Sequence, residues 1–549
     1  MIKMGFNSSW GKLIMNCVTT VRYQIKVNND TTNVIIPGRS LRQGDPLSPY
    51  LFLICAEGLS SMLQKAEERG KIIGIKVCKR APIINHLLFA DDCLIFMKAD
   101  SRSATRLSDI LEQYSVGSGQ SANKMKSSVY FSPNSGASVK RGVKAALQIQ
   151  REAMSEKYLG LPTAAGKITE QQFEHINERS RAKVQGWCER KMSCAAKEVL
   201  LKTVVQALPA FSMSCFKLTK GLCKKLMTNM SKYWWTGSLD KKGMHWQAWD
   251  KMSVAKSQGG LGFRDFETFN DAMLAKQAWR ILDNPNSLCA RVLKGRYFPN
   301  EGFLTAGCPK SASKTWKAII VGREMLKKGL IRRVGDGSTT EVWHDHWIEG
   351  STSMTPMGAL KPNSIQLVAD LINPETNQWD VETIRSLFYP PDADAILAMP
   401  RPRGGGRDIW AWAWEKSGFF IVRSAYRQTM QAKLQLSATV GSSSRAEETW
   451  RALWKLNVLP KIRVFWWRVL KGFLPNYGEL RWRHIKESPH CPMCGHESET
   501  LYHALMECDH AVWFWEAAER FFDIRIPRLH PITWSKDLLD HKLFKQEEA

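Results

Sequence analysis

The chain has 549 residues, and its 78 Lys and Arg against 52 Asp and Glu give a formal net charge of +26. Hydrophobic residues make up 44% of the chain, which excludes a wholly disordered protein, and the length corresponds to roughly three or four domains. The sequence has no apolar run long enough for a transmembrane helix and no secretory leader in residues 1–18, and its 13 cysteines are too irregularly spaced for a secreted disulfide framework.

The first 36 residues predict a helix followed by a β-hairpin. Apolar side chains recur at helical spacing in residues 10–21, whereas residues 23–27 alternate as a strand does. Asn28, Asn29 and Asp30 are a turn signal, and residues 34–36 form a second short strand.

The next segment, residues 39–49 (RSLRQGDPLSP), leads into a second helix. Ser48 followed by Pro49 is typical of an N-cap and a first helical residue, because proline presets φ and lacks an N–H that would be unsatisfied there. Gly44 lets the backbone approach a ligand closely, and Arg42 lies beside it.

Residues 86–96 (HLLFADDCLIF) predict a hairpin that carries two adjacent carboxylates, Asp91 and Asp92. The flanking apolar runs suggest that this hairpin is buried. Like charges about 4 Å apart repel by roughly 4 kcal/mol at an intermediate effective dielectric, and desolvation adds to that cost. A divalent cation would neutralise the pair, and Mg²⁺ favours one or two carboxylates together with substrate phosphates. Taken alone, the pair would fit an exposed hairpin tip better.

The pair does not stand alone, because four motifs in order resemble the reverse transcriptases of LINE-type (non-LTR) retrotransposons, particularly those of plants. The order and spacing of these motifs make the resemblance specific. They are residues 42–52 (RQGDPLSPYLF), residues 89–92 (FADD), Asn123 with Lys126 and Ser127, and residues 158–162 (YLGLP).

This resemblance implies a right-hand polymerase palm that makes DNA from deoxynucleotides, using an RNA template and a DNA primer or target. Asp91 and Asp92 would be catalytic and would bind Mg²⁺ in a two-metal site. The other positions implied are a substrate-binding group, Arg42, Gln43 and Gly44, and a catalytic candidate near the departing pyrophosphate, Lys126.

The sequence departs from the family at one catalytic position. A two-metal site needs a further aspartate from a preceding strand, which in the family lies shortly upstream of the helix that opens this chain. Asp30 and Asp45 are the only acids before Glu57, and neither matches that position. We therefore expect a truncated chain without the fingers region, whose two-metal Mg²⁺ site is incomplete and whose nucleotide transfer on its own is impaired.

The middle of the chain predicts helices and then mixed structure. Residues 166–290 are basic and helical, and the resemblance continues there as a thumb and connector. Their tryptophans fit a helical core better than nucleic-acid stacking. Further on, Trp410, Trp412 and Trp414 alternate as on one face of a strand, and Ser417 with Gly418 would turn that strand back into residues 419–422.

The C-terminal region carries a metal-ligand pattern, C-x₂-C-x₈-H-x₄-C, formed by Cys491, Cys494, His503 and Cys508. Three thiolates and one imidazole favour Zn²⁺ in a closed tetrahedral site, which would be structural. The alternative is four unconnected side chains, with His496 or His510 as decoys. Residues 450–515 also resemble the zinc-binding domain that follows the polymerase in plant LINE-type elements.

Two basic segments suggest a polyanionic partner. Residues 140–234 hold 18 Lys and Arg against 7 Asp and Glu, and residues 451–490 hold 9 against 2. Contacts to phosphates release counterions, which favours nucleic acid. A solubilising lysine coat is the alternative, and charge alone does not separate DNA, RNA and an anionic membrane.

Together these features predict an α+β fold made of a partial polymerase palm, a helical thumb and connector, a mixed linking region and a small helical zinc-binding domain. The expected function is that of a reverse transcriptase fragment; a non-catalytic nucleic-acid-binding zinc protein and a pseudogene product are the alternatives. No membrane partner is expected, and of the nucleus and the cytoplasm the resemblance favours the nucleus. The expected boundaries are 1–165, 166–290, 291–445 and 446–549.

Overall fold

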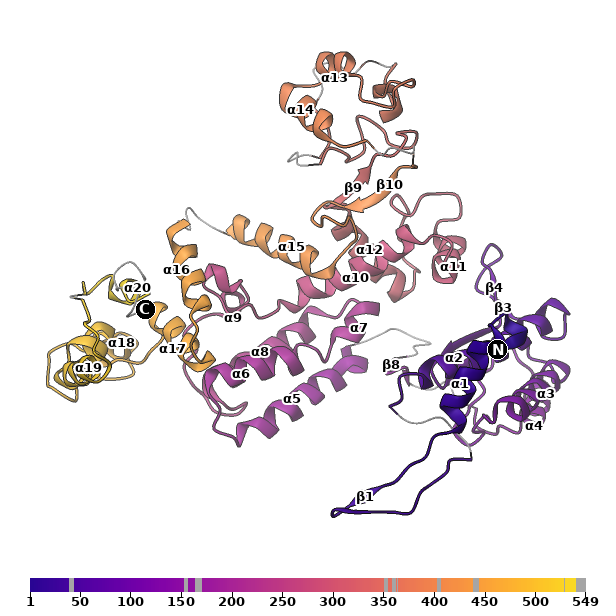
Figure 1. Cartoon of the computed structure of the whole chain (residues 1–549), viewed down its shortest axis with the longest axis horizontal. Helices are drawn as coiled ribbons and strands as arrows, with labels where there is room; N and C mark the ends of the chain where they lie inside the picture. Colours follow the sequence, from indigo (N-terminus) through magenta and orange to yellow (C-terminus); the bar gives the residue numbers. More distant parts are fainter. Residues whose placement is uncertain are drawn as a thin grey trace. The chain divides into compact units, whose positions relative to one another are not determined.

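The computed structural model divides the chain into two compact units (Figure 1). Unit 1 comprises Met1–Lys167 with Asn286–Gly307, and unit 2 comprises Ile168–Pro285 with Cys308–Ala549. The residues that the structure describes are 1–38, 44–152, 157–162, 170–349, 354–357, 362, 364–401, 406–437, 444–527 and 529–539.

Unit 1 combines helices with short antiparallel hairpins. Its strands pair only with a neighbour in the sequence: β1 with β2, β3 with β4, β5 with β6 and β7 with β8. The elements are η1 (Ile2–Met4), α1 (Ser8–Thr19), β1 (Lys26–Val27), β2 (Asp30–Thr31), α2 (Ser48–Glu68), β3 (Ile75–Lys76), β4 (Ile83–Ile84), β5 (His86–Phe89), β6 (Asp92–Ile95), α3 (Ser101–Ser118), α4 (Ala137–Leu147), β7 (Lys157–Tyr158), β8 (Leu161–Pro162) and α11 (Leu288–Tyr297).

The core of unit 1 forms where α2, α3 and α4 meet. Leu63 of α2, Ala104 of α3 and Val143 of α4 are almost fully buried in one cluster. Ile95 and Met97, at and just after the end of β6, pack against the same cluster. The core therefore holds the base of the β5–β6 hairpin.

The predicted N-terminal hairpin forms, but its second strand is Asp30–Thr31 rather than residues 34–36, so Asp30 is in the strand and not in the turn. Lys26 pairs with Thr31 in an antiparallel ladder, and a further bridge joins Tyr23 to Ile35. Asn28 and Asn29 both adopt positive φ, at 49° and 75°, a backbone conformation that asparagine tolerates better than most residues.

The helix after the glycine segment starts one residue earlier than the proline signal predicts. Ser48 is the first residue of α2 rather than its cap, and Leu47 occupies the N-cap position. The Asp45 side chain accepts a hydrogen bond from the Leu47 N–H at 2.8 Å, which closes a turn before the helix, and α2 has no side-chain cap.

Unit 2 is mostly helical. It contains a helical body, a lobe reached through the ribbon β9–β10, and C-terminal helices (Figure 1). The elements are η2 (Glu170–Phe173), α5 (Glu174–Cys188), α6 (Cys194–Leu200), the π-helical η3 (Leu201–Val205), α7 (Ala210–Cys215), α8 (Lys220–Thr236), α9 (Trp249–Met252), η4 (Lys256–Gln258), α10 (Phe266–Asp283), α12 (Lys314–Lys327), β9 (Leu330–Arg333), η5 (Val368–Leu371), α13 (Val381–Leu387), α14 (Pro390–Ala398), β10 (Ile409–Trp412), α15 (Val422–Ser437), α16 (Ser444–Lys455), α17 (Pro460–Leu470), α18 (Tyr477–Trp482), the π-helical η6 (His503–Glu507), α19 (Asp509–Phe522) and α20 (Trp534–Asp537).

The helical body is packed around α10. A Cβ at Gly322 of α12 would lie 2.3 Å from the backbone carbonyl carbon of Leu274, so the two helices approach at a glycine. Tyr233 and Trp234 are 1% and 2% exposed. These two aromatic residues are core residues, as predicted.

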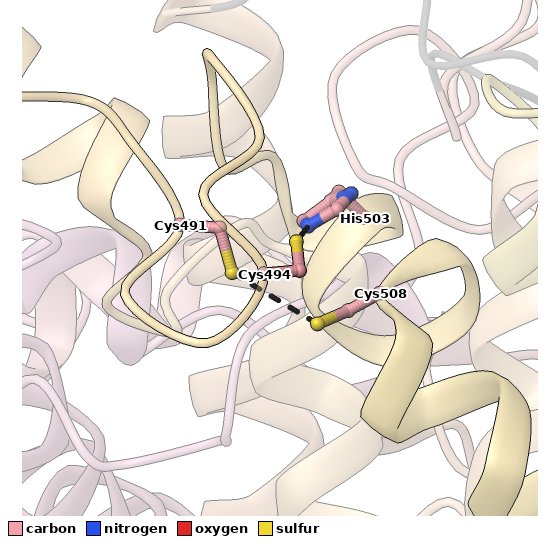
Figure 2. A group of neighbouring side chains, drawn as sticks. All are labelled: Cys491, Cys494, His503 and Cys508. Carbon is pink, nitrogen blue, oxygen red and sulfur yellow. Dashed lines mark hydrogen bonds between the residues drawn. The ribbon is translucent and has the colours of Figure 1, made fainter.

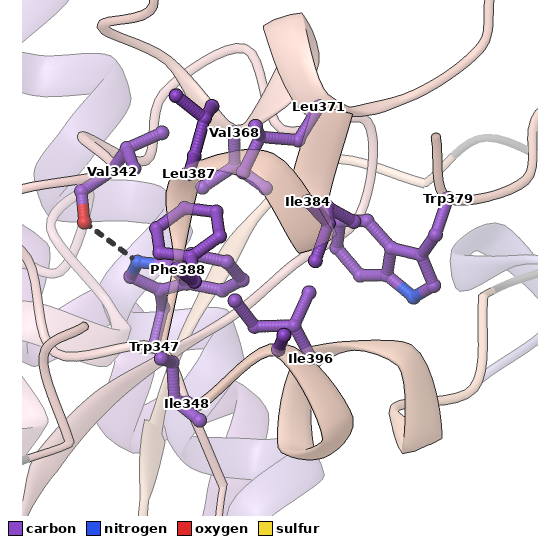
Figure 3. Close-up of a cluster of buried hydrophobic side chains, with 11 residues drawn as sticks. Val342, Trp347, Ile348, Val368, Leu371, Trp379, Ile384, Leu387, Phe388 and Ile396 are labelled. Carbon is purple, nitrogen blue, oxygen red and sulfur yellow. Dashed lines mark hydrogen bonds between the residues drawn. The ribbon is translucent and has the colours of Figure 1, made fainter. Parts of the chain in front are cut away.

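The lobe between β9 and β10 has its own apolar core, drawn in Figure 3. Trp347 is fully buried there, and its indole N–H donates to the Val342 carbonyl at 2.9 Å. The buried indole therefore has no unpaired N–H donor. An unpaired buried donor would destabilise the folded lobe.

A buried aspartate organises the entrance to this lobe. The carboxylate of Asp408 accepts hydrogen bonds from the N–H groups of Gly335, Gly337 and Thr339 and from the hydroxyls of Thr339 and Thr340, at 2.7–3.1 Å. Burial acts to raise the pKa of Asp408, but these hydrogen bonds outweigh it and the pKa lies below its ordinary value.

The hairpin predicted between residues 410 and 422 is wrong. β10 pairs antiparallel with β9, with Trp410 opposite Arg332 and Trp412 opposite Leu330. The expected turn does form locally, since the Trp412 N–H donates to the Gly418 carbonyl at 2.7 Å. Trp414 lies beyond the end of the strand and contacts the Trp412 ring edge-on.

The mixture of helices and few strands confirms the predicted α+β class. Across the part of the chain that is described, every helix is too short or too polar to cross a bilayer. The bounds of the four predicted domains stay predictions.

Candidate functional site

The Asp91–Asp92 pair lies at the tip of the β5–β6 hairpin. Phe89 is paired with Asp92, so Ala90 and Asp91 form a two-residue turn, and Ala90 adopts a φ of 49°. Because side chains alternate along a strand, Asp92 shares a face with Phe89 and Leu87.

The opposite face of this hairpin is anchored to α2. His86 forms a hydrogen bond through its Nε2 to the Ser60 hydroxyl at 2.9 Å. Burial lowers the pKa of His86, and the negative charges of Glu57 and Glu67 only partly oppose this shift. The hairpin is thus held at its base and projects its tip outward.

The expectation that this hairpin is buried is wrong. Asp91 and Asp92 are exposed, and Phe89 on the same face as Asp92 is 60% exposed. The apolar pattern is typical of two strands at the centre of a larger sheet. In the described residues, however, β5 and β6 pair only with each other. Mutual repulsion therefore costs less here than in a buried site.

Asp92 interacts electrostatically with Tyr158, which lies on a different strand, β7. Burial is the main cause that raises the pKa of Tyr158 on β7, and the negative charges of Asp92 and Cys93 raise it further. The pKa of Cys93 is also raised, by burial first and then by Asp92. Tyr158 therefore lies within electrostatic range of the aspartate hairpin.

The other predicted palm residues are not brought into one described cluster. Gly44 precedes α2 and has a φ of 82°, which suits glycine. Lys126 is exposed in a turn whose N–H groups bond to Asn123. Arg42 and Gln43 lie outside the described residues. Within the described residues, Asp91 and Asp92 do not form a metal-ligand cluster with any third Cys, His, Asp or Glu.

The cysteine–histidine pattern does converge in space (Figure 2). The ligand atoms of Cys491, Cys494, His503 and Cys508 all lie within 4.8 Å of one another. The Sγ atoms of Cys491 and Cys508 are 3.9 Å apart, and Cys494 Sγ is 3.2 Å from His503 Nε2. The four ligands are thus neighbours despite their separation in the sequence.

This geometry fits a tetrahedral zinc site. Zn–S bonds of about 2.3 Å place two thiolates about 3.8 Å apart at tetrahedral angles, close to the separation of Cys491 and Cys508. Cys491, His503 and Cys508 are buried, so the site is closed, as a structural site requires. Burial raises the pKa of the Cys491 thiol, and a bound cation would favour its thiolate form.

Local backbone structure brings the ligands together. A turn closes between Cys491 and Gly495, whose N–H donates to the Cys491 carbonyl at 2.9 Å and whose φ is 76°. His503 starts the π-helical η6, and Cys508 is the N-cap of α19. The ligands therefore come from one turn and from the two ends of a helical segment.

The predicted decoys are not ligands. The ring of His496 stacks on His503 with centroids 4.5 Å apart, and His510 contacts Trp513. Sequence reasoning missed the support that His496 gives to the ligand ring. The only signal was its position two residues after Cys494, which does not specify stacking.

Two family descriptions match the chain. Residues 2–163 match "Reverse transcriptase (RNA-dependent DNA polymerase)", and residues 420–515 match "zinc-binding in reverse transcriptase". The first segment contains the aspartate hairpin, and the second contains all four cysteine and histidine ligands.

Three curated proteins illustrate the relationships. An uncharacterized mitochondrial protein of Arabidopsis thaliana is 45% identical over 152 residues, which is 28% of this chain and 99% of that protein. A putative ribonuclease H protein of the same plant is 28% identical over 65% of this chain and 57% of its own length. The transposon TX1 uncharacterized 149 kDa protein of Xenopus laevis is 20% identical over 88% of this chain. The chain thus spans 57% of the second relative and 42% of the third.

Proposed function

Because the chain belongs to the reverse transcriptases of plant LINE-type (non-LTR) retrotransposons, we propose that it acts in RNA-templated DNA synthesis and that Asp91 and Asp92 bind the catalytic Mg²⁺. The observation that supports this proposal is the match of residues 2–163 to the reverse transcriptase family, together with the position of both carboxylates at the exposed end of the β5–β6 hairpin. A substrate phosphate can approach the pair there without rearrangement of the core.

The carboxylates fit the ligand chemistry of Mg²⁺, which takes one or two carboxylates and completes its shell with phosphates and water. When bound, the metal would activate the primer hydroxyl and neutralise the leaving pyrophosphate. Asp91 and Asp92 would hold it, and the main-chain pairing of Phe89 with Asp92 fixes the turn that presents them.

The substrate contacts are also part of the proposal. Arg42, Gln43 and Gly44 would contact the nucleotide and the template, and Lys126 would lie near the pyrophosphate. The partners would be an RNA template, a DNA primer or target and deoxynucleotides, and the site of action would be the nucleus. With no third carboxylate beside the doublet in the described residues, we propose that synthesis by the chain alone is impaired.

Primer extension on an RNA template with Mg²⁺ tests the assignment. Asp91→Asn and Asp92→Asn should each abolish whatever incorporation the wild type supports, because they remove charge and keep shape. Asp109→Asn on α3, an exposed aspartate paired with Arg106, is the matched control and should have no effect. Incorporation that persists in both doublet variants would refute the catalytic role of the pair.

A non-catalytic nucleic-acid-binding protein is the second candidate, favoured by the net charge of +26. It predicts affinity that falls steeply with salt and shows little base preference, with no incorporation by wild type. Affinity unchanged between about 50 and 200 mM salt would argue against it.

A further inference from the structure

An exposed tryptophan surrounded by cations lies beside the zinc cluster. Trp482, the last residue of α18, is 72% exposed. The Arg483 guanidinium lies 5.6 Å from the centre of its ring and also pairs with Glu479 at 2.8 Å. Single exposed aromatic residues are common on protein surfaces, so the charges around the ring decide which partner it suits.

A second tryptophan and further cations adjoin α18. Arg483 also lies 4.8 Å from the ring of Trp246, so the loop that follows α8 meets α18. Arg481 and Lys486, which lie close to Trp482 in the sequence, are exposed. We call the surface formed by Trp482 with Arg481, Arg483 and Lys486 the Trp482 platform.

Arg481 and Lys486 are exposed, and no ion pair to either occurs among the described residues. The exposed acid closest to them in the sequence is Glu487. By contrast, Lys225 in the same unit is paired with Glu170 and Glu174. The platform thus keeps free positive charge around an open ring.

The zinc cluster holds the platform in shape. The buried Glu499, between two zinc ligands, accepts the Tyr477 N–H at the start of α18 at 2.6 Å. Its own N–H donates to the Pro489 carbonyl at 2.8 Å. α18 is therefore fixed to the ligand-bearing segment, and Trp482 is presented from a rigid element.

We propose that the Trp482 platform binds single-stranded nucleic acid, with one base stacked on Trp482 and the backbone phosphates on the surrounding arginines and lysine. Sequence-independent single-strand sites combine a cationic track with aromatic rings in this way. A duplex offers no free base face and binds only through its phosphates. The proposal rests on the proposed function only in taking a nucleic acid as partner.

A second exposed aromatic group shows why charge decides between partners. Trp513 and Phe514 on α19 are 66% and 63% exposed, but they lie on a helix that carries Asp509, Glu516 and Glu519. Phosphate would be repelled there. Trp513→Ala is therefore a matched control that removes an equally exposed ring from the same C-terminal region.

The test is fluorescence anisotropy of labelled 20-mers of oligothymidine, oligouridine and a DNA duplex, with the full zinc-loaded chain and no deoxynucleotides. Trp482→Ala should weaken single-strand binding about 10-fold without changing the salt slope, and Trp482→Phe should restore most of it. Trp513→Ala should have no effect. The two single strands reveal whether RNA or DNA is preferred.

Charge removal should give a different signature. Arg481→Ala with Lys486→Ala should reduce the slope of log K against log salt by about 1.4, because each phosphate contact on a single strand contributes about 0.7. Arg423→Ala with Arg427→Ala on α15 removes the same charge elsewhere and should leave the slope unchanged. A 5-iodouracil oligonucleotide should crosslink within residues 477–490.

Three outcomes would overturn the proposal: equal affinity of Trp482→Ala and wild type, equal weakening by Trp482→Ala and Trp513→Ala, or crosslinks confined to other segments. Zinc content is measured for each variant. If Trp482→Ala loses zinc, Trp482→Phe and the crosslink decide. Since binding is measured without synthesis, failure here is distinguishable from failure of the polymerase assignment.

Discussion

Replacement of Cys508 by serine removes one of the four ligand atoms that converge within 4.8 Å. The sulfur separation of 3.9 Å between Cys491 and Cys508 is already near the tetrahedral value of about 3.8 Å, so little binding energy is spent on rearrangement. Structural zinc sites in small peptides have apparent free energies of about 10–16 kcal/mol, or dissociation constants from about 50 nM to about 2 pM. At about 10 µM free zinc this corresponds to roughly 3–9 kcal/mol of stabilisation.

The assay combines metal analysis with limited proteolysis of the segment between the ligands. Wild type should retain one zinc per chain after dialysis and become protease-sensitive within residues 491–508 when a strong chelator is added. Cys508→Ser should lose the metal and be sensitive from the start. Cys308→Ser, an exposed thiol in the same unit, is the control and should behave as wild type. Full zinc retention by Cys508→Ser, or protease resistance in chelator, would refute the reasoning.

Three further predictions concern packing and charge. Trp467 is fully buried and donates to the Gly259 carbonyl at 3.0 Å, so Trp467→Ala should lower the unfolding free energy of unit 2 by about 3–5 kcal/mol, and Trp467→Phe by about 1–2, in urea denaturation; equal losses would contradict the contribution of ring packing. Asp408→Ala should cost at least about 3 kcal/mol and speed hydrogen exchange at residues 335–340, because it leaves five donors unpaired, whereas Asp394→Ala, which changes an exposed aspartate of the same lobe, should do neither. His86 has a folded pKa below its ordinary 6.5, so the unfolded state binds more protons and unit 1 should lose stability as pH falls below about 6.5; thermal melts of His86→Gln should show a weaker dependence over that range.

Local patterns predicted the parts of the site that depend on residues close in sequence. The C-x₂-C-x₈-H-x₄-C spacing identified all four atoms of the zinc cluster, because one turn and one helical segment suffice to bring them together. The aspartate hairpin was equally local, since two apolar runs flank the Asp91–Asp92 pair, although the register that puts Ala90 and Asp91 in the turn was not predicted.

What the sequence did not reveal depends on contacts between distant segments. The strand at Trp410 pairs with residues 330–333, almost 80 positions earlier, rather than with the adjacent residues 419–422. The exposure of Asp92 depends on which strands flank β5 and β6, and its approach to Tyr158 depends on a segment more than 60 residues later. Periodicity does not encode partners of this kind.

The lobe is an insertion between the paired strands β9 and β10. Arg333 and Ile409 are register partners, so the chain leaves the helical body and returns to it at almost the same point. Everything between them could in principle be replaced by a two-residue turn without moving the strands. The lobe is therefore free to diverge, lengthen or be exchanged during evolution while the body keeps its packing, and it is the natural position for grafting a foreign domain into this protein.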